Sequence, residues 1–141
     1  MSLLILDSSA TLAWIYGDEV TEAIRRVFEA VADNGALVPA LWRLEVANSL
    51  TMAIRRRRID QDFRRAALSD LALLDITTDQ QTDFYAWSNT LNLADRFQLT
   101  VYDAAYLELA QRRALPLATL DQDLGKAAMA LSVKVLGTEL K

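Results

Sequence analysis

Residues 3–7 read Leu3-Leu4-Ile5-Leu6-Asp7, four apolar side chains followed by a carboxylate. A short run that is apolar throughout is typical of a strand buried on both faces, as in a parallel sheet covered by helices. Similar runs occur at residues 36–38 and at residues 117–120, and Asp121 follows the second of them. Helical patterns separate the runs. The sequence therefore predicts an α/β fold, a three-layer α/β/α sandwich around a central, mainly parallel sheet.

The expected elements alternate along the whole chain. Strands are predicted at residues 3–6, 36–38, 75–78, 117–120 and 133–136, of which 75–78 is the weakest. Helices are predicted at residues 8–16, 21–32, 41–57, 60–74, 79–94, 103–113 and 124–131. The third helix carries an apolar stripe of Leu44, Ala47, Leu50, Ala53 and Ile54. No linker or repeat interrupts the pattern, so we expect a single domain over residues 1–141.

The composition narrows the chemistry that the chain can perform. Its 141 residues include no Cys and no His. This excludes a thiolate nucleophile, a His-based catalytic triad and the usual zinc site. A bound metal would have oxygen ligands only, which favours Mg²⁺ or Mn²⁺. The net charge of −4 argues against binding nucleic acid through overall positive charge.

The apolar segments are short. None approaches the length that spans a membrane, and the apolar start of the chain has no basic flank of the kind found in targeting segments. We therefore expect a cytoplasmic protein that does not associate with a membrane.

Four carboxylates stand where predicted strands end or predicted helices begin: Asp7, Glu45, Asp103 and Asp121. Functional groups of parallel sheets gather beyond the carboxyl ends of the strands. Two carboxylates about 4 Å apart repel by roughly 4 kcal/mol at an effective dielectric of about 20, so a converging cluster needs a divalent cation or retained protons. In the alternative reading, the three aspartates are helix N-caps, and Glu45 pairs with Arg43 or a distant Arg.

Four segments, in this order, resemble the PIN-domain nucleases, specifically the VapC-like toxins of prokaryotic toxin–antitoxin pairs: residues 4–9 (LILDSS), 44–48 (LEVAN), 102–106 (YDAAY) and 118–121 (ATLD). The resemblance implies an α/β/α sandwich and metal-dependent endoribonuclease activity, with one or two Mg²⁺ or Mn²⁺ ions. It makes Asp7, Glu45, Asp103 and Asp121 the acidic metal-binding and catalytic quartet. Asp7 and Asp103 would be direct ligands. Asp123 matches a common variation of the family, although the position at a strand end favours Asp121.

The resemblance also implies partners. VapC-like toxins pair with an antitoxin protein and commonly form homodimers, and their early helices commonly form the antitoxin groove. Apolar residues of the early helices fit either that groove or the core: Leu12, Ile15, Val27, Phe28 and Val31. The alternative to a toxin nuclease is a PIN-like binding module that acts with its antitoxin in DNA-binding autoregulation, with little or no nuclease activity.

Several polar residues lie next to the acidic quartet in sequence. Thr119 lies two positions before Asp121, on the same side of the strand, where its hydroxyl can hold a carboxylate or a water. Asn48 lies one helical turn after Glu45 and either orients it or is a surface residue. Ser8 and its neighbour Ser9 either add hydroxyls beside Asp7 or help to start the next helix.

The largest charge block is Arg55-Arg56-Arg57-Arg58. It either complements a helix C-terminus or contacts RNA phosphates about 15–20 Å from Glu45, and Arg64, Arg65, Arg112 and Arg113 are candidates to extend it. Core or interface positions are expected for the three tryptophans, with base stacking as the alternative: Trp14, Trp42 and Trp87.

Overall fold

The computed structural model describes residues 3–18 and 20–138. Five strands form one sheet, in which every neighbouring pair is parallel and the order is β3-β2-β1-β4-β5. The strands are β1 (Leu4–Leu6), β2 (Ala36–Val38), β3 (Ile76–Thr78), β4 (Leu117–Ala118) and β5 (Val135–Leu136). All residues of β1 and β2 are buried, as expected for strands covered on both faces.

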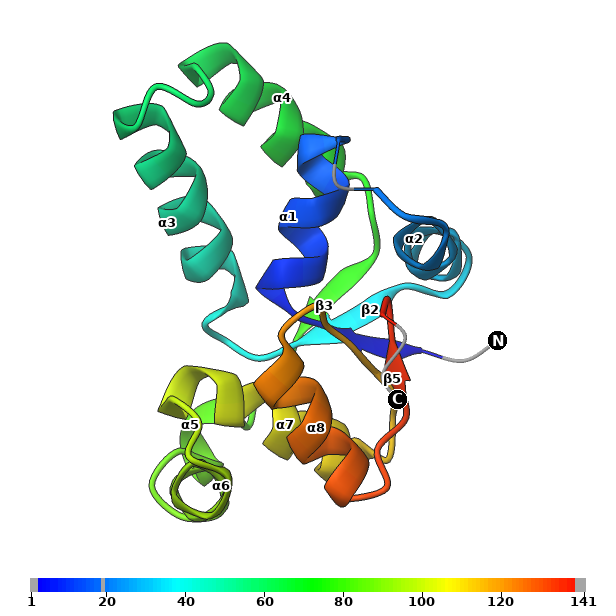
Figure 1. The fold of residues 1–141 in the computed structure, drawn as a ribbon, viewed down its shortest axis with the longest axis vertical. Coiled ribbons are helices and arrows are strands. Elements are labelled where there is room, and N and C mark those ends of the chain that lie inside the picture. Colours follow the sequence, from blue (N-terminus) through cyan, green and yellow to red (C-terminus); the bar gives the residue numbers. More distant parts are fainter. Residues whose placement is uncertain (1–2, 19, 139–141) are drawn as a thin grey trace.

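Helices cover both faces of the sheet. Figure 1 shows the first four helices on one side and the last four on the other, so the predicted three-layer sandwich is confirmed. The helices are α1 (Ser8–Tyr16), α2 (Glu22–Asn34), α3 (Trp42–Arg55), α4 (Gln61–Ala72), α5 (Thr82–Tyr85), α6 (Asn89–Phe97), α7 (Val101–Arg113) and α8 (Gln122–Ala130). In the described part of the chain, no helix has the length and apolar character needed to cross a bilayer.

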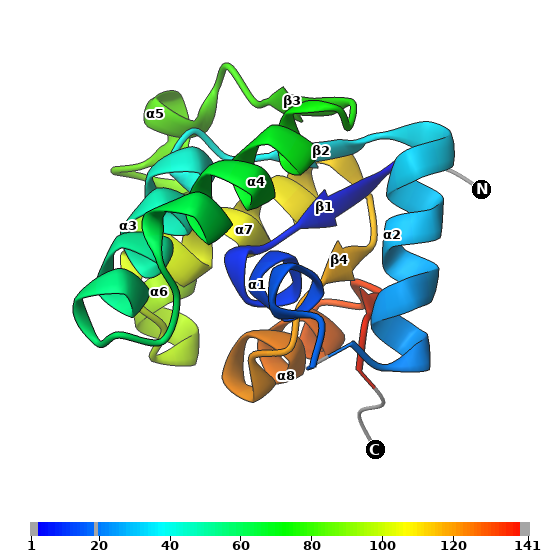
Figure 2. The same ribbon diagram turned by 90° about the horizontal axis from the view of Figure 1, so that it is seen from above.

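The strand order reverses between β1 and β4. The chain runs from β1 outward through β2 to β3, and then returns to the other side of β1 to form β4 and β5. Figure 2 shows β1 between β2 and β4. Open parallel sheets bind ligands at such a switch point, outside the carboxyl ends of the strands. Asp7 directly follows β1 and Thr119 directly follows β4, so both lie at this point.

Helix α7 lies in the interior of the molecule. Seven consecutive residues, 104–110, are buried, because the helix packs against β1 and β4 as well as against α6 and α8. A helix that is apolar on all sides is typical of such a position. Its first turn, which carries Asp103, is therefore fixed at the carboxyl edge of the sheet.

Two sequence predictions about helices were wrong in detail. The helix predicted over residues 79–94 is two helices, α5 and α6, with a break at residues 86–88. In the stripe predicted on α3, Leu44 is 75% exposed, whereas Trp42 and Val46 are buried. The indole nitrogen Nε1 of Trp42 donates a hydrogen bond to Thr11 Oγ1 (3.1 Å). With Trp42 and Val46 facing the core, Leu44 lies on the outer side of the helix.

Candidate active site at the carboxyl edge of the sheet

Asp7 is the buried centre of the site, with only 4% of its surface exposed. It is the N-cap of α1, since its Oδ1 accepts a hydrogen bond from the Ala10 backbone N–H (2.9 Å). The Ser9 hydroxyl lies 2.8 and 2.9 Å from the two carboxylate oxygens, and Thr119 donates to Oδ2. The capping role proposed as the alternative reading is therefore present, together with two hydroxyl contacts that an N-cap does not require.

The hydroxyls of Ser9 and Thr119 also accept hydrogen bonds from the backbone. The backbone N–H of Leu120 donates to Ser9 Oγ (2.9 Å), and that of Asp121 donates to Thr119 Oγ1 (3.0 Å). Each hydroxyl thus accepts from the backbone after β4 and directs its own proton toward Asp7. Asp7 receives three donors, whereas a carboxylate has about four lone-pair positions, which leaves one for a further ligand. The contact predicted between Thr119 and a carboxylate is present.

Burial raises the pKa of Asp7 from 3.8 to about 6, because the ionised carboxylate loses contact with water. The hydrogen bonds from Ala10, Thr119 and Ser9 oppose this rise, and repulsion from Asp103 adds to it. The folded protein therefore binds this proton more tightly than the unfolded chain does. As the pH rises from about 4 to about 6, the unfolded chain releases the proton first, and the folded state loses stability relative to it.

Asp7→Asn is accordingly expected to stabilise the metal-free protein by about 3 kcal/mol at pH 7–8, since the pKa rises by about two units and each unit corresponds to about 1.4 kcal/mol. The gap should shrink as the pH falls through about 6 and close below about pH 3, where Asp7 is protonated in both states. Urea unfolding in EDTA at several pH values measures it. Asp33→Asn, at an exposed carboxylate of α2, is the control that should follow the wild type. A gap that widens as the pH falls would contradict the assignment.

Asp103 lies in the first turn of α7, where the other carboxylates act on it. Burial raises its pKa, and repulsion from Asp121, Glu45 and Asp123 raises the pKa further. Asp103 is not the N-cap of its helix, because that role belongs to Thr100, whose hydroxyl accepts from the Asp103 backbone N–H (3.1 Å). The capping alternative for Asp103 was therefore wrong. Its carboxylate instead lies close enough to Asp121, Glu45 and Asp123 to be repelled by them.

Glu45 lies in the first turn of α3 and is half-buried. Its Oε1 accepts a hydrogen bond of 2.6 Å from the Tyr106 hydroxyl. The alternative pairing with Arg43 is not what the structure shows, because the Arg43 guanidinium contacts Thr78 Oγ1 (2.5 Å) and the Ile76 carbonyl (3.3 Å). Tyr106 did not emerge from the sequence as a site residue. The available signal was its spacing of three residues from Asp103 on a helix, which places both on one side.

The remaining predicted residues lie around this centre. Asp121 caps α8, with its Oδ1 accepting from the Leu124 N–H (2.9 Å), and Asp123 is exposed in the first turn of the same helix. Ser8 forms a hydrogen bond with Tyr106. Asn48 is exposed on α3. Within residues 3–18 and 20–138, no three carboxylates are placed so that they could already hold a metal ion. The acids of the quartet are therefore close enough to repel one another, but in the described residues they do not form a complete metal-binding site.

The basic run lies at the far end of α3. Arg55 ends the helix, Arg56 and Arg57 are exposed after it, and the Arg58 guanidinium lies over the Tyr16 ring (4.1 Å). Contact of this run with RNA stays a prediction. The suggested extension through Arg112 was wrong, because that side chain is largely buried in ion pairs with Asp79 and Glu108.

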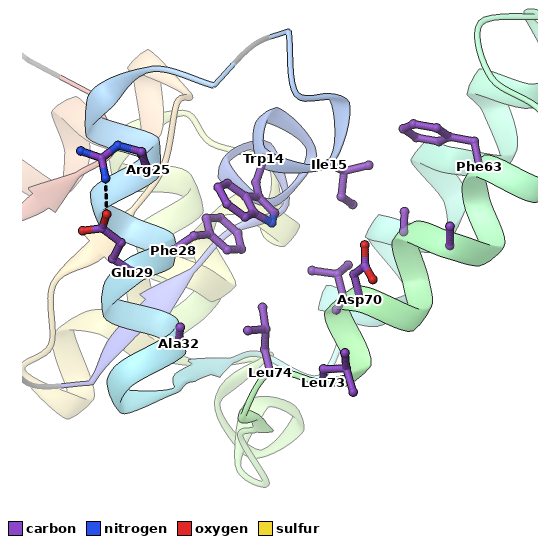
Figure 3. A pocket seen from close by; sticks show the side chains of 13 residues that line it. Trp14, Ile15, Arg25, Phe28, Glu29, Ala32, Phe63, Asp70, Leu73 and Leu74 are labelled. Carbon is purple, nitrogen blue, oxygen red and sulfur yellow. Dashed lines mark hydrogen bonds and ion pairs between the residues drawn. The ribbon is translucent and has the colours of Figure 1, made fainter.

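A groove of about 770 Å³ lies between α1, α2 and α4 (Figure 3). Trp14 lines it, with its ring stacked on Phe28 at 4.7 Å, and so do Phe63 of α4 and Leu74, which follows α4. Five residues of the early helices were expected to lie either in a groove or in the core. Of these, Ile15 and Phe28 line the groove. Val27 and Val31 are buried in the core, against which Leu12 also packs.

The tryptophans differ in exposure. Trp42 is buried in the core and Trp14 is 39% exposed in the groove. Trp87 is 91% exposed, so the core reading is wrong for this residue. Trp87 lies in the break between α5 and α6.

Comparison with known proteins agrees with this architecture. The model of the PIN domain family matches residues 4–129. The chain is 30% identical over 128 residues to Ribonuclease VapC3 of Pyrobaculum aerophilum, a match that covers 91% of this chain and 96% of that protein. The crystal structure of PAE2754 from Pyrobaculum aerophilum has the same fold, with a TM-score of 0.62, 24% identity and coverage of 90% and 87% of the two chains. Since the family model spans most of the sequence and the relative is 30% identical over 91% of it, the chain belongs to the PIN domain family.

Proposed function

We propose that the protein is a metal-dependent endoribonuclease that hydrolyses RNA phosphodiesters. The observation that carries the proposal is the position of Asp103, whose carboxylate is repelled by Asp121, Glu45 and Asp123 at the switch point of the sheet. A fold that keeps so much negative charge at one edge gains from a cation there. The similarity to Ribonuclease VapC3 supports the same class of reaction.

The residues present fit Mg²⁺ or Mn²⁺. The site offers only carboxylate and hydroxyl oxygens, the ligands that these ions prefer. Asp7 has a lone pair left after its three hydrogen bonds, and Asp103 adds a second carboxylate at the same edge. We assign Asp7 and Asp103 as direct ligands, with Glu45 and Asp121 binding directly or through water. One or two ions would bind to this set of oxygens.

Each side chain has a defined task in this proposal. A divalent ion would lower the pKa of a bound water and neutralise charge at the phosphate. Ser9 and Thr119 fix the orientation of Asp7, so that its remaining lone pair points to one place. With no His in the chain, the carboxylates of the quartet orient the attacking water and accept its proton.

Metal removal tests the proposal. In EDTA, the purified protein is expected to leave RNA intact, and Mn²⁺ or Mg²⁺ should start cleavage. Mn²⁺ at about 100 times its Kd should also raise the unfolding midpoint by roughly 5–10 °C, because an ion that binds only the folded state stabilises it by about 2.7 kcal/mol. Asp103→Asn is the matched variant, expected to lose most of this shift. Intact RNA together with an unchanged midpoint would refute the proposal.

We further propose that the nuclease is the toxin of a toxin–antitoxin pair, that it is cytoplasmic and that it forms a homodimer. The groove between α1, α2 and α4 is the proposed antitoxin surface, since the aromatic and aliphatic side chains that line it suit an amphipathic helix. Co-expression with the protein encoded by the adjacent reading frame tests the pairing. The binding-module alternative predicts tight DNA binding with that partner and intact RNA in Mn²⁺.

A further inference from the structure

We infer that Tyr106 is a positioning residue of the acidic site, whose buried hydroxyl holds the Glu45 carboxylate toward Asp103. The inference rests on the proposed metal-dependent function and adds a residue to it. Nothing in the motif of four acids requires a tyrosine at this position, so the assignment depends on the contacts of this chain.

The hydrogen bond joins two elements across the site. The Tyr106 hydroxyl lies 2.6 Å from Glu45 Oε1, and the two residues are 61 positions apart in the chain. Tyr106 is 1% exposed and stands one helical turn after Asp103 on α7, whereas Glu45 comes from the first turn of α3. The bond therefore couples the helix that carries Asp103 to the helix that carries Glu45.

The direction of this bond is fixed by its surroundings. Burial raises the pKa of Tyr106 far above its usual value, and the bond to Glu45 and the negative charges of Glu45 and Asp7 raise it further. Only the hydrogen bond from Ser8 favours the phenolate. The phenol therefore keeps its proton and donates a hydrogen bond to Glu45. An ionised carboxylate can only accept, so in the 2.6 Å contact the Tyr106 hydroxyl proton is directed at Glu45 Oε1.

The bond matters more for geometry than for folding. Glu45 is half-buried, so water can solvate its carboxylate when the tyrosine hydroxyl is absent. Glutamate has three side-chain torsions, and an unrestrained Glu45 would spend only part of the time facing Asp103. Groups that orient metal ligands typically change metal affinity by about 10- to 100-fold when they are removed. We expect the lower end of this range for one neutral donor.

Tyr106→Phe removes the hydroxyl and keeps the ring. Isothermal titration should show Mn²⁺ binding about tenfold more weakly than in the wild type. RNA cleavage should need correspondingly more Mn²⁺, while kcat at saturating Mn²⁺ stays within about threefold of the wild type. Tyr16→Phe is the matched control, since the Tyr16 ring packs on Phe63 and Arg58 away from the acids. Its Mn²⁺ affinity should not change.

A double-mutant cycle separates positioning from packing. If Tyr106 acts through Glu45, adding Tyr106→Phe to Glu45→Ala should leave Mn²⁺ affinity unchanged within about twofold. An equal loss in both backgrounds would overturn the inference, as would a metal-free unfolding midpoint of Tyr106→Phe more than about 10 °C below the wild type. A wild type that binds Mn²⁺ no better than Tyr106→Phe does would overturn the inference alone. A wild type that binds no Mn²⁺ and cleaves no RNA would overturn the proposed function.

Discussion

Asp103→Asn is expected to lower the rate of Mn²⁺-dependent RNA cleavage by about a thousandfold, which corresponds to about 4 kcal/mol of transition-state stabilisation. The substitution removes a carboxylate that three other acids repel, and this carboxylate is a proposed direct metal ligand. The fold should be unharmed. Burial and repulsion raise the pKa of Asp103, which means that its negative charge destabilises the folded state. A neutral amide at this position removes that cost. A rate assay and urea unfolding of the same preparation measure both effects.

The controls for this variant distinguish the members of the quartet. Asp33→Asn, on the exposed surface of α2, should retain full activity. Asp121→Asn should lose more activity than Asp123→Asn, because repulsion from Asp121 raises the pKa of Asp103 more than repulsion from Asp123 does. The reverse order would make Asp123 the fourth acid. Full activity of Asp103→Asn would end the metal-site assignment.

The fold follows from local sequence signals to a large extent. The apolar runs at β1 and β2 become fully buried strands, and parallel pairing follows from the helices between them. The break between α5 and α6 could not be foreseen, since residues 86–88 contain no Gly or Pro. The exposure of Leu44 likewise depends on tertiary packing, since α3 turns Trp42 and Val46 toward the core instead. Helical periodicity in the sequence predicts which face of a helix is apolar. It does not predict which side chains the tertiary packing then buries.

The acids of the site were easier to predict than the groups that hold them. Asp7 directly follows β1, and Asp121 lies between β4 and α8, three residues past the end of β4 rather than at the end of a strand over residues 117–120 as predicted, so the topology rule places both at the carboxyl edge. Tyr106 reads as one more apolar residue of a buried helix, and its role appears only when α3 brings Glu45 to within 2.6 Å. The role of Ser9 is equally hidden in the sequence. Its hydroxyl accepts a hydrogen bond from the Leu120 N–H, which is 111 positions away in the chain. A bond between distant segments leaves no local trace in the sequence.

Arg112→Ala is expected to destabilise the protein by about 3–5 kcal/mol, a large share of the roughly 5–15 kcal/mol that holds a domain together. The Arg112 guanidinium bonds both oxygens of Asp79 (2.7 and 3.2 Å) and both oxygens of Glu108 (2.8 and 3.0 Å). The side chains of both partners are about 5% exposed or less. Removing the cation leaves two carboxylates together in a site that water barely reaches. Chemical denaturation at pH 7.5 measures the loss.

The pH dependence of that loss identifies its cause. Burial works to raise the pKa of Asp79, but the hydrogen bonds from Arg112 and Thr82 outweigh it and hold the pKa below its usual value. Without Arg112, only the hydrogen bonds from Thr82 and from the Gln81 backbone still oppose burial, so the variant should hold a proton on Asp79 more readily and recover stability toward pH 4–5. Combining Arg112→Met with Asp79→Asn and Glu108→Gln should restore much of the stability at pH 7.5, since no buried charge then remains. A loss independent of pH would instead assign it to packing against Tyr85, over whose ring the guanidinium lies at 4.6 Å.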